Sequence, residues 1–147
     1  MRLWHKDLIP YLPRKQLLGQ WRECCAIAKR ISEKGTPGHI LVNKIMEYPL
    51  EDFFTYGMAV CAEMKKRGYG PTQNAIADFT KHILDHDEKG VQYIDLEEVF
   101  FLWHTPRYLL QCLYNLQEKY DCGGVTEEEW NKILFLYKGG SDVHKSL

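Results

Sequence analysis

The first residues of the chain place an amine and a cation one predicted helix away from a carboxylate. "MRLW" begins with Met1 and Arg2, and "LLGQWRE" ends with Arg22 and Glu23. An α-amine has an ordinary pKa of about 7.7–8.0, against about 10.4 for lysine, so part of a free amine is unprotonated near neutral pH. Such amines attack carbonyl-like carbon and form Schiff bases. If Met1 keeps a free amine, these groups suit attack on a sugar carbon next to phosphates.

A helix has to position the carboxylate, and the sequence predicts one from Pro13 to about Glu33. Proline is tolerated in a first helical turn, and Gly35 follows the last turn as a stop signal. Arg22 and Glu23 lie outside the apolar face, on opposite sides of it, so both are expected at the surface. The apolar face, at helical spacing, consists of Leu17, Leu18, Trp21, Cys24, Cys25, Ala28 and Ile31.

Glu23 is predicted to stand in a shallow depression between Gly19 and Ala26, which lie about one helical turn away. A glycine inside a helix costs about 1 kcal/mol relative to alanine, so its presence favours a position where another group approaches the backbone. That group is either a substrate or another segment of the chain. The alternative is that Arg22 and Glu23 belong to an ordinary solvated helix surface.

The rest of the pattern is also helical. We predict an all-α fold, an irregular single-domain helical bundle with a non-helical N-terminal arm. A length of 147 residues favours one domain. Thr126 and Glu129 have the spacing of a capping box before the last helix. No segment alternates apolar and polar residues as a half-buried strand does. The further helices are predicted at 50–67, 72–86, 106–120 and 126–137, with a short helix or turn over 95–103.

Charge is distributed unevenly along the chain. Residues 1–35 hold eight Lys or Arg and three acids, whereas residues 72–147 hold seven bases and thirteen acids. The basic first quarter suggests a local phosphate-binding face, and the alternative, which charge alone favours, is a chance asymmetry of solvated side chains. The net charge of −1 by itself favours no class of partner.

The composition indicates the cellular compartment in which the protein is expected. The five cysteines are an odd number without a CxxC motif, which favours reduced thiols over a disulfide framework. Charged residues and prolines interrupt the N-terminal segment where a signal peptide would need an apolar core, and no apolar run approaches the roughly 20 residues of a membrane span. We therefore expect a cytoplasmic protein without a membrane partner, and the oligomeric state stays open.

The segments "MRLW", "LLGQWRE" and "CAEMKKRGY" resemble the pyrimidine-dimer DNA glycosylase family, whose best-known member is a phage endonuclease for UV-damaged DNA. The resemblance covers about 1–35 and 50–70, and "HTPRYLLQCLYNLQEKY" is weakly similar to the family's last core helix. On this basis 1–70 and about 104–120 would form the family-like core, with 71–100 and 121–147 as additions.

The resemblance implies a DNA repair glycosylase with an associated β-elimination (AP lyase) activity on damaged duplex DNA. In the family the N-terminal α-amine attacks the deoxyribose C1′, and an imine forms before the strand is cut. Met1 would supply that amine, and Glu23 would be the essential carboxylate. Arg2 and Arg22 would hold phosphates. Neither a metal nor another cofactor is expected.

The chain departs from the family pattern at three positions. Gln16 stands where the phage enzyme has a histidine, and Ala26 stands where it has an arginine. The third departure is the nucleophile, which would come from methionine rather than threonine and would still be an amine. Two basic residues that do not match the family by position, Lys29 and Arg30, are candidates to replace the missing phosphate contact. Trp4 would either stack against a base or anchor the arm.

Other motifs offer weaker alternatives. His82 and His86 have the spacing of two metal ligands on one helical face, but no third ligand is evident. The stretch from Asp85 to Leu96 has parts of a calcium loop but lacks oxygen ligands at two required positions, Lys89 and Leu96. The alternative function is a non-catalytic helical protein of the same fold that binds nucleic acid or another protein.

Overall fold

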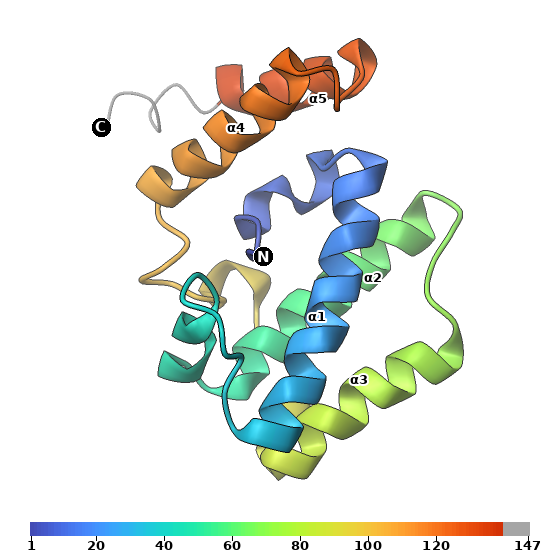
Figure 1. Cartoon of the computed structure of the whole chain (residues 1–147), viewed down its shortest axis with the longest axis vertical. Helices are drawn as coiled ribbons and strands as arrows, with labels where there is room; N and C mark the ends of the chain where they lie inside the picture. The colour runs from blue at the N-terminus through green and yellow to red at the C-terminus, as the bar shows by residue number, and fades with distance from the viewer. Residues whose placement is uncertain (140–147) are drawn as a thin grey trace.

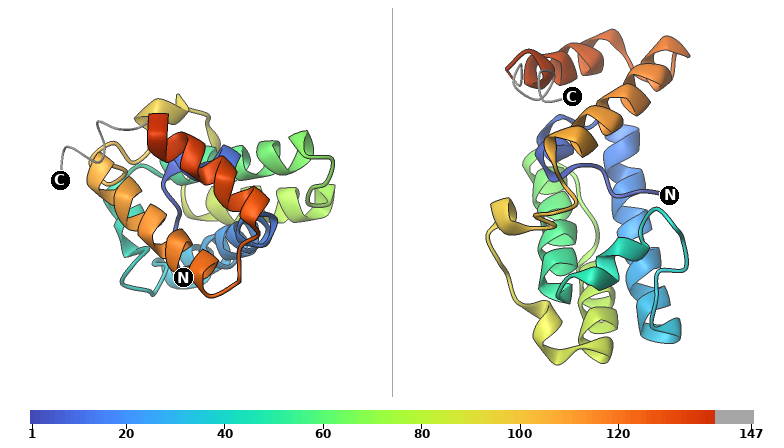
Figure 2. Two further views of the ribbon diagram at one scale, coloured as in Figure 1. Left: turned by 90° about the horizontal axis from the view of Figure 1, so that it is seen from above. Right: turned by 90° about the vertical axis from the view of Figure 1, so that its left-hand side faces the viewer.

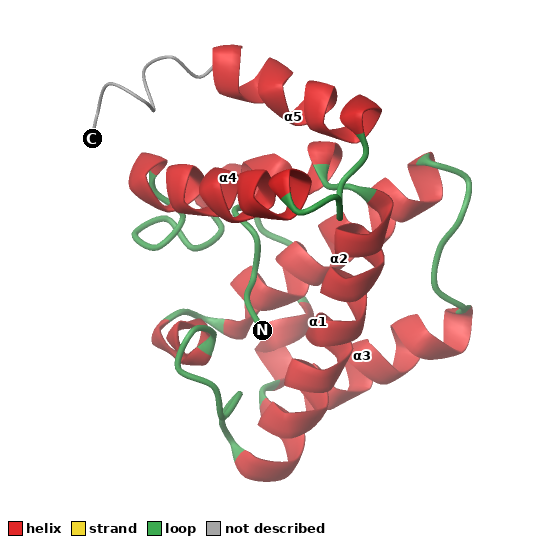
Figure 3. Ribbon diagram, turned by 45° about the horizontal axis from the view of Figure 1, so that its top comes forward, coloured by secondary structure: helices red, strands yellow, loops and turns green. Residues whose placement is uncertain are grey.

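Helices build the fold, which a computed structural model describes over residues 1–139. No strand is present within these residues, so the all-α prediction is confirmed (Figures 1 and 3). Residues 140–147 of the predicted addition at 121–147 lie outside the described part. The α-helices are α1 (Arg14–Lys34), α2 (Leu50–Lys66), α3 (Gln73–His86), α4 (Pro106–Asp121) and α5 (Glu127–Gly139). Short 3-10 helices are η1 (Lys6–Tyr11), η2 (Asn43–Glu47), η3 (Glu88–Val91) and η4 (Leu96–Glu98).

Three helices, α1, α2 and α3, pack together around aromatic side chains, while α4 and α5 pair at one end of this group (Figure 2). The ring of Phe79 on α3 lies 5.3 Å from the ring of Trp21 on α1 and 5.5 Å from that of Phe53 on α2. Gly57 lets α2 approach this cluster, because a Cβ at that position would overlap the Phe79 ring. These contacts make α1 a rigid support for its outward-facing residues.

The helix ends follow the local sequence. Gly35 ends α1 in the left-handed conformation, with φ of 76°, and its N–H donates to the carbonyl of Ile31. The predicted capping box is confirmed: Glu129 N donates to Thr126 Oγ1 at 3.1 Å, and Thr126 N donates to Glu129 Oε1 at 3.0 Å. The short helix or turn predicted over 95–103 is η4 followed by a turn. The sequence did not predict η1, η2 or η3, because such short elements leave no periodic pattern.

The arm that precedes η1 is non-helical over residues 1–5, as predicted, and it runs into the core. Leu3 is fully buried and Trp4 is 6% exposed. The Leu3 carbonyl accepts a hydrogen bond of 2.5 Å from the hydroxyl of Tyr108 on α4, and the Trp4 carbonyl accepts one of 2.6 Å from Tyr56 on α2. The arm is therefore fixed between helices, and its direction determines where the N-terminus lies.

Candidate active site

The N-terminus lies next to the carboxylate of Glu23. Arg2 N donates to Glu23 Oε2 at 3.4 Å. Neighbouring backbone nitrogens are separated by three bonds, so the α-amine of Met1 lies within about 7 Å of that oxygen. Met1 is exposed and Glu23 is half-buried, so both groups remain open to a ligand. The structure thus brings together the amine and the carboxylate that the sequence predicted as partners.

Gln20 fastens the arm to α1 and was missed by the sequence analysis. Its Nε2 donates to the Arg2 carbonyl at 2.9 Å and to Glu23 Oε2 at 3.2 Å. Its Oε1 accepts from Trp4 N at 2.7 Å and from the Tyr56 hydroxyl at 2.8 Å. Because this amide is buried and every polar atom of its head group is bonded, it fixes both the arm and the carboxylate. Its spacing of three residues from Glu23 on one helix was the available signal.

The surface next to Glu23 is open, as the glycine suggested. A Cβ built at Gly19 would meet no atom within 4 Å outside its own helix backbone and its chain neighbours. Ala26, on the other side of Glu23, is exposed. No segment of the described chain therefore fills the depression at Gly19, and a ligand could reach the α1 backbone there.

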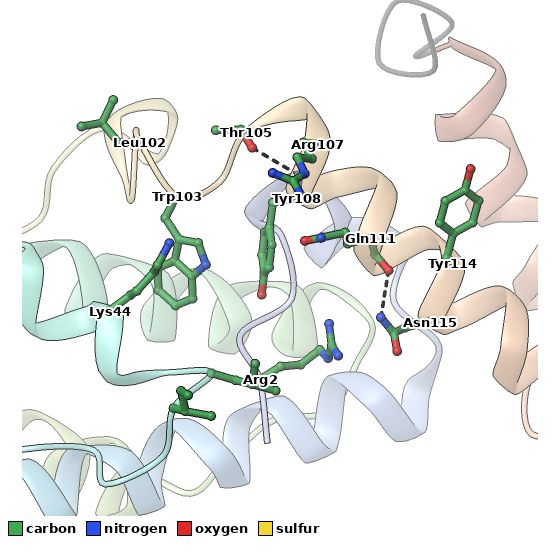
Figure 4. A pocket seen from close by; sticks show the side chains of 12 residues that line it. Arg2, Lys44, Leu102, Trp103, Thr105, Arg107, Tyr108, Gln111, Tyr114 and Asn115 are labelled. Atoms are coloured by element: carbon green, nitrogen blue, oxygen red, sulfur yellow. Dashed lines mark hydrogen bonds between the residues drawn. The ribbon is translucent and has the colours of Figure 1, made fainter. Parts of the chain in front are cut away.

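A groove of about 850 Å³ lies alongside the arm, between η2 and α4 (Figure 4). Three cations from separate segments line it: Arg2, Lys44 and Arg107. Among its lining residues in the described chain none is acidic, so its field favours an anionic ligand. The aromatic side chains of Trp103, Tyr108 and Tyr114 also contribute to the walls.

The α4 wall of the groove presents a polar stripe. Arg107, Gln111 and Asn115 follow one another at intervals of four residues and therefore share a helix face (Figure 4). Asn115 Nδ2 donates to the Gln111 carbonyl at 2.9 Å, one turn earlier. The sequence analysis did not assign these residues or Lys44, although the spacing of four in "PRYLLQCLYN" was visible.

The other predicted DNA contacts occupy different places. Arg22, Lys29 and Arg30 are exposed on α1 and do not line the groove, and Lys29 Nζ lies 4.0 Å from Glu33 Oε1. Trp4 is in the core, with the Arg2 guanidinium 5.3 Å from its ring centre. This burial favours the anchoring alternative for Trp4, because a base has no exposed face on which to stack.

The cysteines are free, and the buried and half-buried ones are poorly suited to act as nucleophiles. Burial raises the pKa of the Cys25 thiol to about 11 and that of Cys61 to about 12. Burial also raises the pKa of Cys112, which lies on α4. Since the thiolate is the reactive form, these residues do not compete with an amine near neutral pH.

The described residues offer neither a metal cluster nor a membrane-spanning helix. Within residues 1–139, no group of three or more His, Cys, Asp or Glu side chains is arranged to hold a metal ion. The helices of the same part of the chain are all too short or too polar to cross a membrane.

An all-α fold that holds an amine, a carboxylate and a cationic groove side by side has the parts of an enzyme acting on nucleic acid. Residues 1–77, more than half of the chain, match the family described as pyrimidine dimer DNA glycosylase. The chain belongs to this family. Members of this family are enzymes of DNA repair, so the protein is an enzyme that acts on DNA. Membership of the family thus favours the catalytic function over the non-catalytic alternative. No curated protein and no solved structure gave a significant match.

Proposed function

We propose that the protein joins glycosylase and AP lyase chemistry in one site, with the α-amine of Met1 as nucleophile. The observation that carries this proposal is the 3.4 Å separation between Arg2 N and Glu23 Oε2, which holds the preceding amine next to a carboxylate. An amine within about 7 Å of a proton acceptor can cooperate with it through one or two waters once the substrate is bound.

The proposed reaction passes through an imine between the Met1 nitrogen and C1′. The unprotonated amine forms a bond to the deoxyribose C1′ as the bond from C1′ to the base breaks, and the base leaves with the bonding electrons and takes up a proton. The nitrogen, now bonded to C1′, then passes its remaining proton to O4′ as the C1′–O4′ bond breaks, so that the sugar ring opens and an imine forms at C1′. Removal of a proton from C2′ expels the 3′ phosphate by β-elimination, and water releases the product from the amine.

Glu23 has two roles in this scheme. Its negative charge stabilises the positive charge that develops on the sugar as the base departs. The carboxylate then assists proton transfer during ring opening and elimination. Gln20 is a positioning residue, because it bonds to Glu23 Oε2 and to the Arg2 carbonyl without facing the open depression.

DNA binding is assigned to two sets of cations. The groove cations Arg2, Lys44 and Arg107 contact phosphates near the reacting sugar, and the exposed cations of α1 contact the flanking backbone. Arg2 belongs to the first set and follows Met1 directly, so a duplex held in the groove lies close to the Met1 amine. The free energy needed to expose a damaged nucleotide is lower than that for an intact one, because damaged bases stack and pair poorly.

Borohydride trapping tests the covalent step. The native protein is incubated with duplex DNA that carries an abasic site, and the imine is reduced to a stable amine. We expect a protein–DNA adduct whose cross-linked peptide begins at Met1. The matched control carries one additional residue before Met1, which displaces the amine and should abolish both adduct and cleavage. Strand cleavage by the native protein without a trapped adduct would refute the Schiff-base mechanism.

A further inference from the structure

The turn between α1 and η2 exposes two large apolar side chains beside the groove. Ile40 is 84% exposed and Leu41 is 49% exposed, and both line the groove together with Arg2. Across the groove, Leu102 is 78% exposed (Figure 4). Apolar side chains gathered at the edge of a cationic groove are unusual on a monomer surface and mark an interaction site.

Hydrogen bonds fix the shape of this turn. His39 N donates to Asn43 Oδ1 at 3.0 Å, and Asn43 N donates to the His39 carbonyl at 2.9 Å. Leu41 N donates to His39 Nδ1 at 3.2 Å, and the next residue, Val42, is fully buried as an anchor. Ile40 is therefore presented on a preformed tip, and its exposure does not come from a loose loop.

The backbone before the tip is also specific. Gly38 has a φ of 73°, in the left-handed region that favours glycine. A Cβ at this position would overlap the guanidinium of Arg30. The turn therefore packs closely against a cation of α1, and Lys44 lines the groove together with Ile40. An apolar tip between cations fits a polyanion that has an apolar interior.

We propose that Ile40 is a wedge that enters the base stack of the bound duplex, while the neighbouring cations hold the phosphates. Apolar side chains of this size insert between base steps from the minor groove, partly unstack them and kink the duplex. This inference rests on DNA binding through the groove, and it adds a residue that opens the substrate for the proposed chemistry.

The wedge also explains how a nucleotide of duplex DNA can reach the depression at Glu23. A stacked duplex keeps its sugars on the outside and its bases inside, so a separated base step is needed before an amine can reach C1′ beneath a base. Ile40 and Arg2 line the same groove. Insertion at the tip thus moves the neighbouring nucleotide out of the stack next to the amine.

A fluorescent base tests the wedge directly. The probe is a duplex with a tetrahydrofuran abasic analogue, which cannot form an imine, and 2-aminopurine at the adjacent step. Saturating native protein should increase the 2-aminopurine emission severalfold, because this base is quenched when stacked. Ile40→Ser should lose most of the increase and bind about tenfold more weakly. The salt slope of its binding should be unchanged, because no phosphate contact is removed.

Two further variants control for size and for surface hydrophobicity. Ile40→Leu should keep the fluorescence increase. Leu84→Ser removes an exposed leucine from α3, outside the groove, and should behave as the native protein does. Thermal melting verifies that Ile40→Ser stays folded.

The fluorescence experiment and the borohydride experiment test the wedge and the lyase chemistry separately. The wedge is refuted if Ile40→Ser matches the native emission, or if native protein fails to bind the probe or binds without raising its emission. Emission that depends on Ile40, in a protein that gives no borohydride adduct, supports the wedge and removes the lyase proposal. An exposed tip that serves a protein partner instead would leave DNA binding by Ile40→Ser unaltered.

Discussion

Gln20 Nε2 donates a hydrogen bond of 3.2 Å to Glu23 Oε2, so the proposed catalytic carboxylate is held by the same amide that holds the N-terminal arm. The two residues lie one turn apart on α1, and the arm crosses the helix at this turn. Any change that releases the amide would therefore displace the nucleophile and the carboxylate together.

Glu23→Gln separates binding from chemistry. The change keeps the size of the side chain and removes the charge that would stabilise the sugar cation. We expect cleavage of damaged DNA to be slower by about a hundredfold or more. Binding should be at least as tight as that of the native protein, because a negative charge near phosphates is lost. Glu33→Gln, on the same helix, is the control and should cleave normally; native-rate cleavage by Glu23→Gln would remove Glu23 from the active site.

Gln20→Met tests the attachment of the arm. Methionine has a similar size but leaves Trp4 N without its buried acceptor, while the Tyr56 hydroxyl keeps the Trp4 carbonyl, so the free energy of unfolding should fall by about 1–3 kcal/mol. Urea denaturation measures this loss, and cleavage should fall more than DNA binding. Gln16→Met is the matched control: the buried Oε1 of Gln16 has no hydrogen-bond partner among residues 1–139, and its loss should not destabilise the protein. If both variants lowered the free energy of unfolding equally, Gln20 would not be the residue that holds the arm on α1.

Gly19→Ala should stabilise the free protein and impair its reaction. The added Cβ meets open space, so α1 gains up to about 1 kcal/mol of helix stability. If the substrate occupies the depression beside Glu23, the same methyl group intrudes on it and slows single-turnover cleavage. Gly57→Ala provides the contrast, since its Cβ would overlap Phe79 and destabilise the core. A Gly19→Ala protein that is more stable and fully active would place the substrate elsewhere.

Arg107→Ala tests whether the α4 wall contacts phosphate. Loss of one phosphate contact should make the slope of log K against log salt shallower by about 0.9 on duplex DNA. Arg22→Ala should have a similar effect if α1 contacts the flanking backbone. Arg14→Ala is the control, because the Arg14 guanidinium lies 4.4 Å from the centre of the Tyr69 ring and does not line the groove. A slope equal to that of Arg14→Ala would exclude Arg107 from the interface.

His104 should make the protein less stable in mild acid. Burial lowers the pKa of this imidazole to about 2, and its Nδ1 accepts a hydrogen bond of 3.0 Å from Lys6 N. Below about pH 6.5 the unfolded chain binds a proton that the folded His104 does not, so stability falls by up to about 1.4 kcal/mol per pH unit. Burial lowers the pKa of the neighbouring His5 as well, which adds to the same trend.

Denaturation between pH 7.5 and 5.5 measures this slope above the range in which ordinary carboxylates titrate. His104→Gln should flatten the curve, because glutamine can accept from Lys6 N without titrating. His86→Gln, at the exposed end of α3, is the surface control. A His104→Gln protein with the native slope would show that other groups control the acid response.

The sequence predicted the helices and the partnership of Met1 with Glu23, because both depend on local patterns: helical periodicity, capping residues and the small residues around Glu23. It could not predict the groove, which forms where Arg2, Lys44 and Arg107 meet from distant segments. Gln20 was missed for the same reason, since its partner Tyr56 lies on another helix. The burial of Trp4 follows from the path of the arm through the core, which no local pattern encodes.

Tyr108 and His104 bind the arm from beyond the family-matched segment, with Tyr108 lying 105 residues after its partner Leu3. Gln20 and Tyr56 hold the arm from within the first 77 residues, whereas the bonds from His104 and Tyr108 form only when the last third of the chain is present. A fragment that stops at residue 77 would contain the amine, Glu23 and Gln20, but it would lack the second half of the contacts that hold the arm.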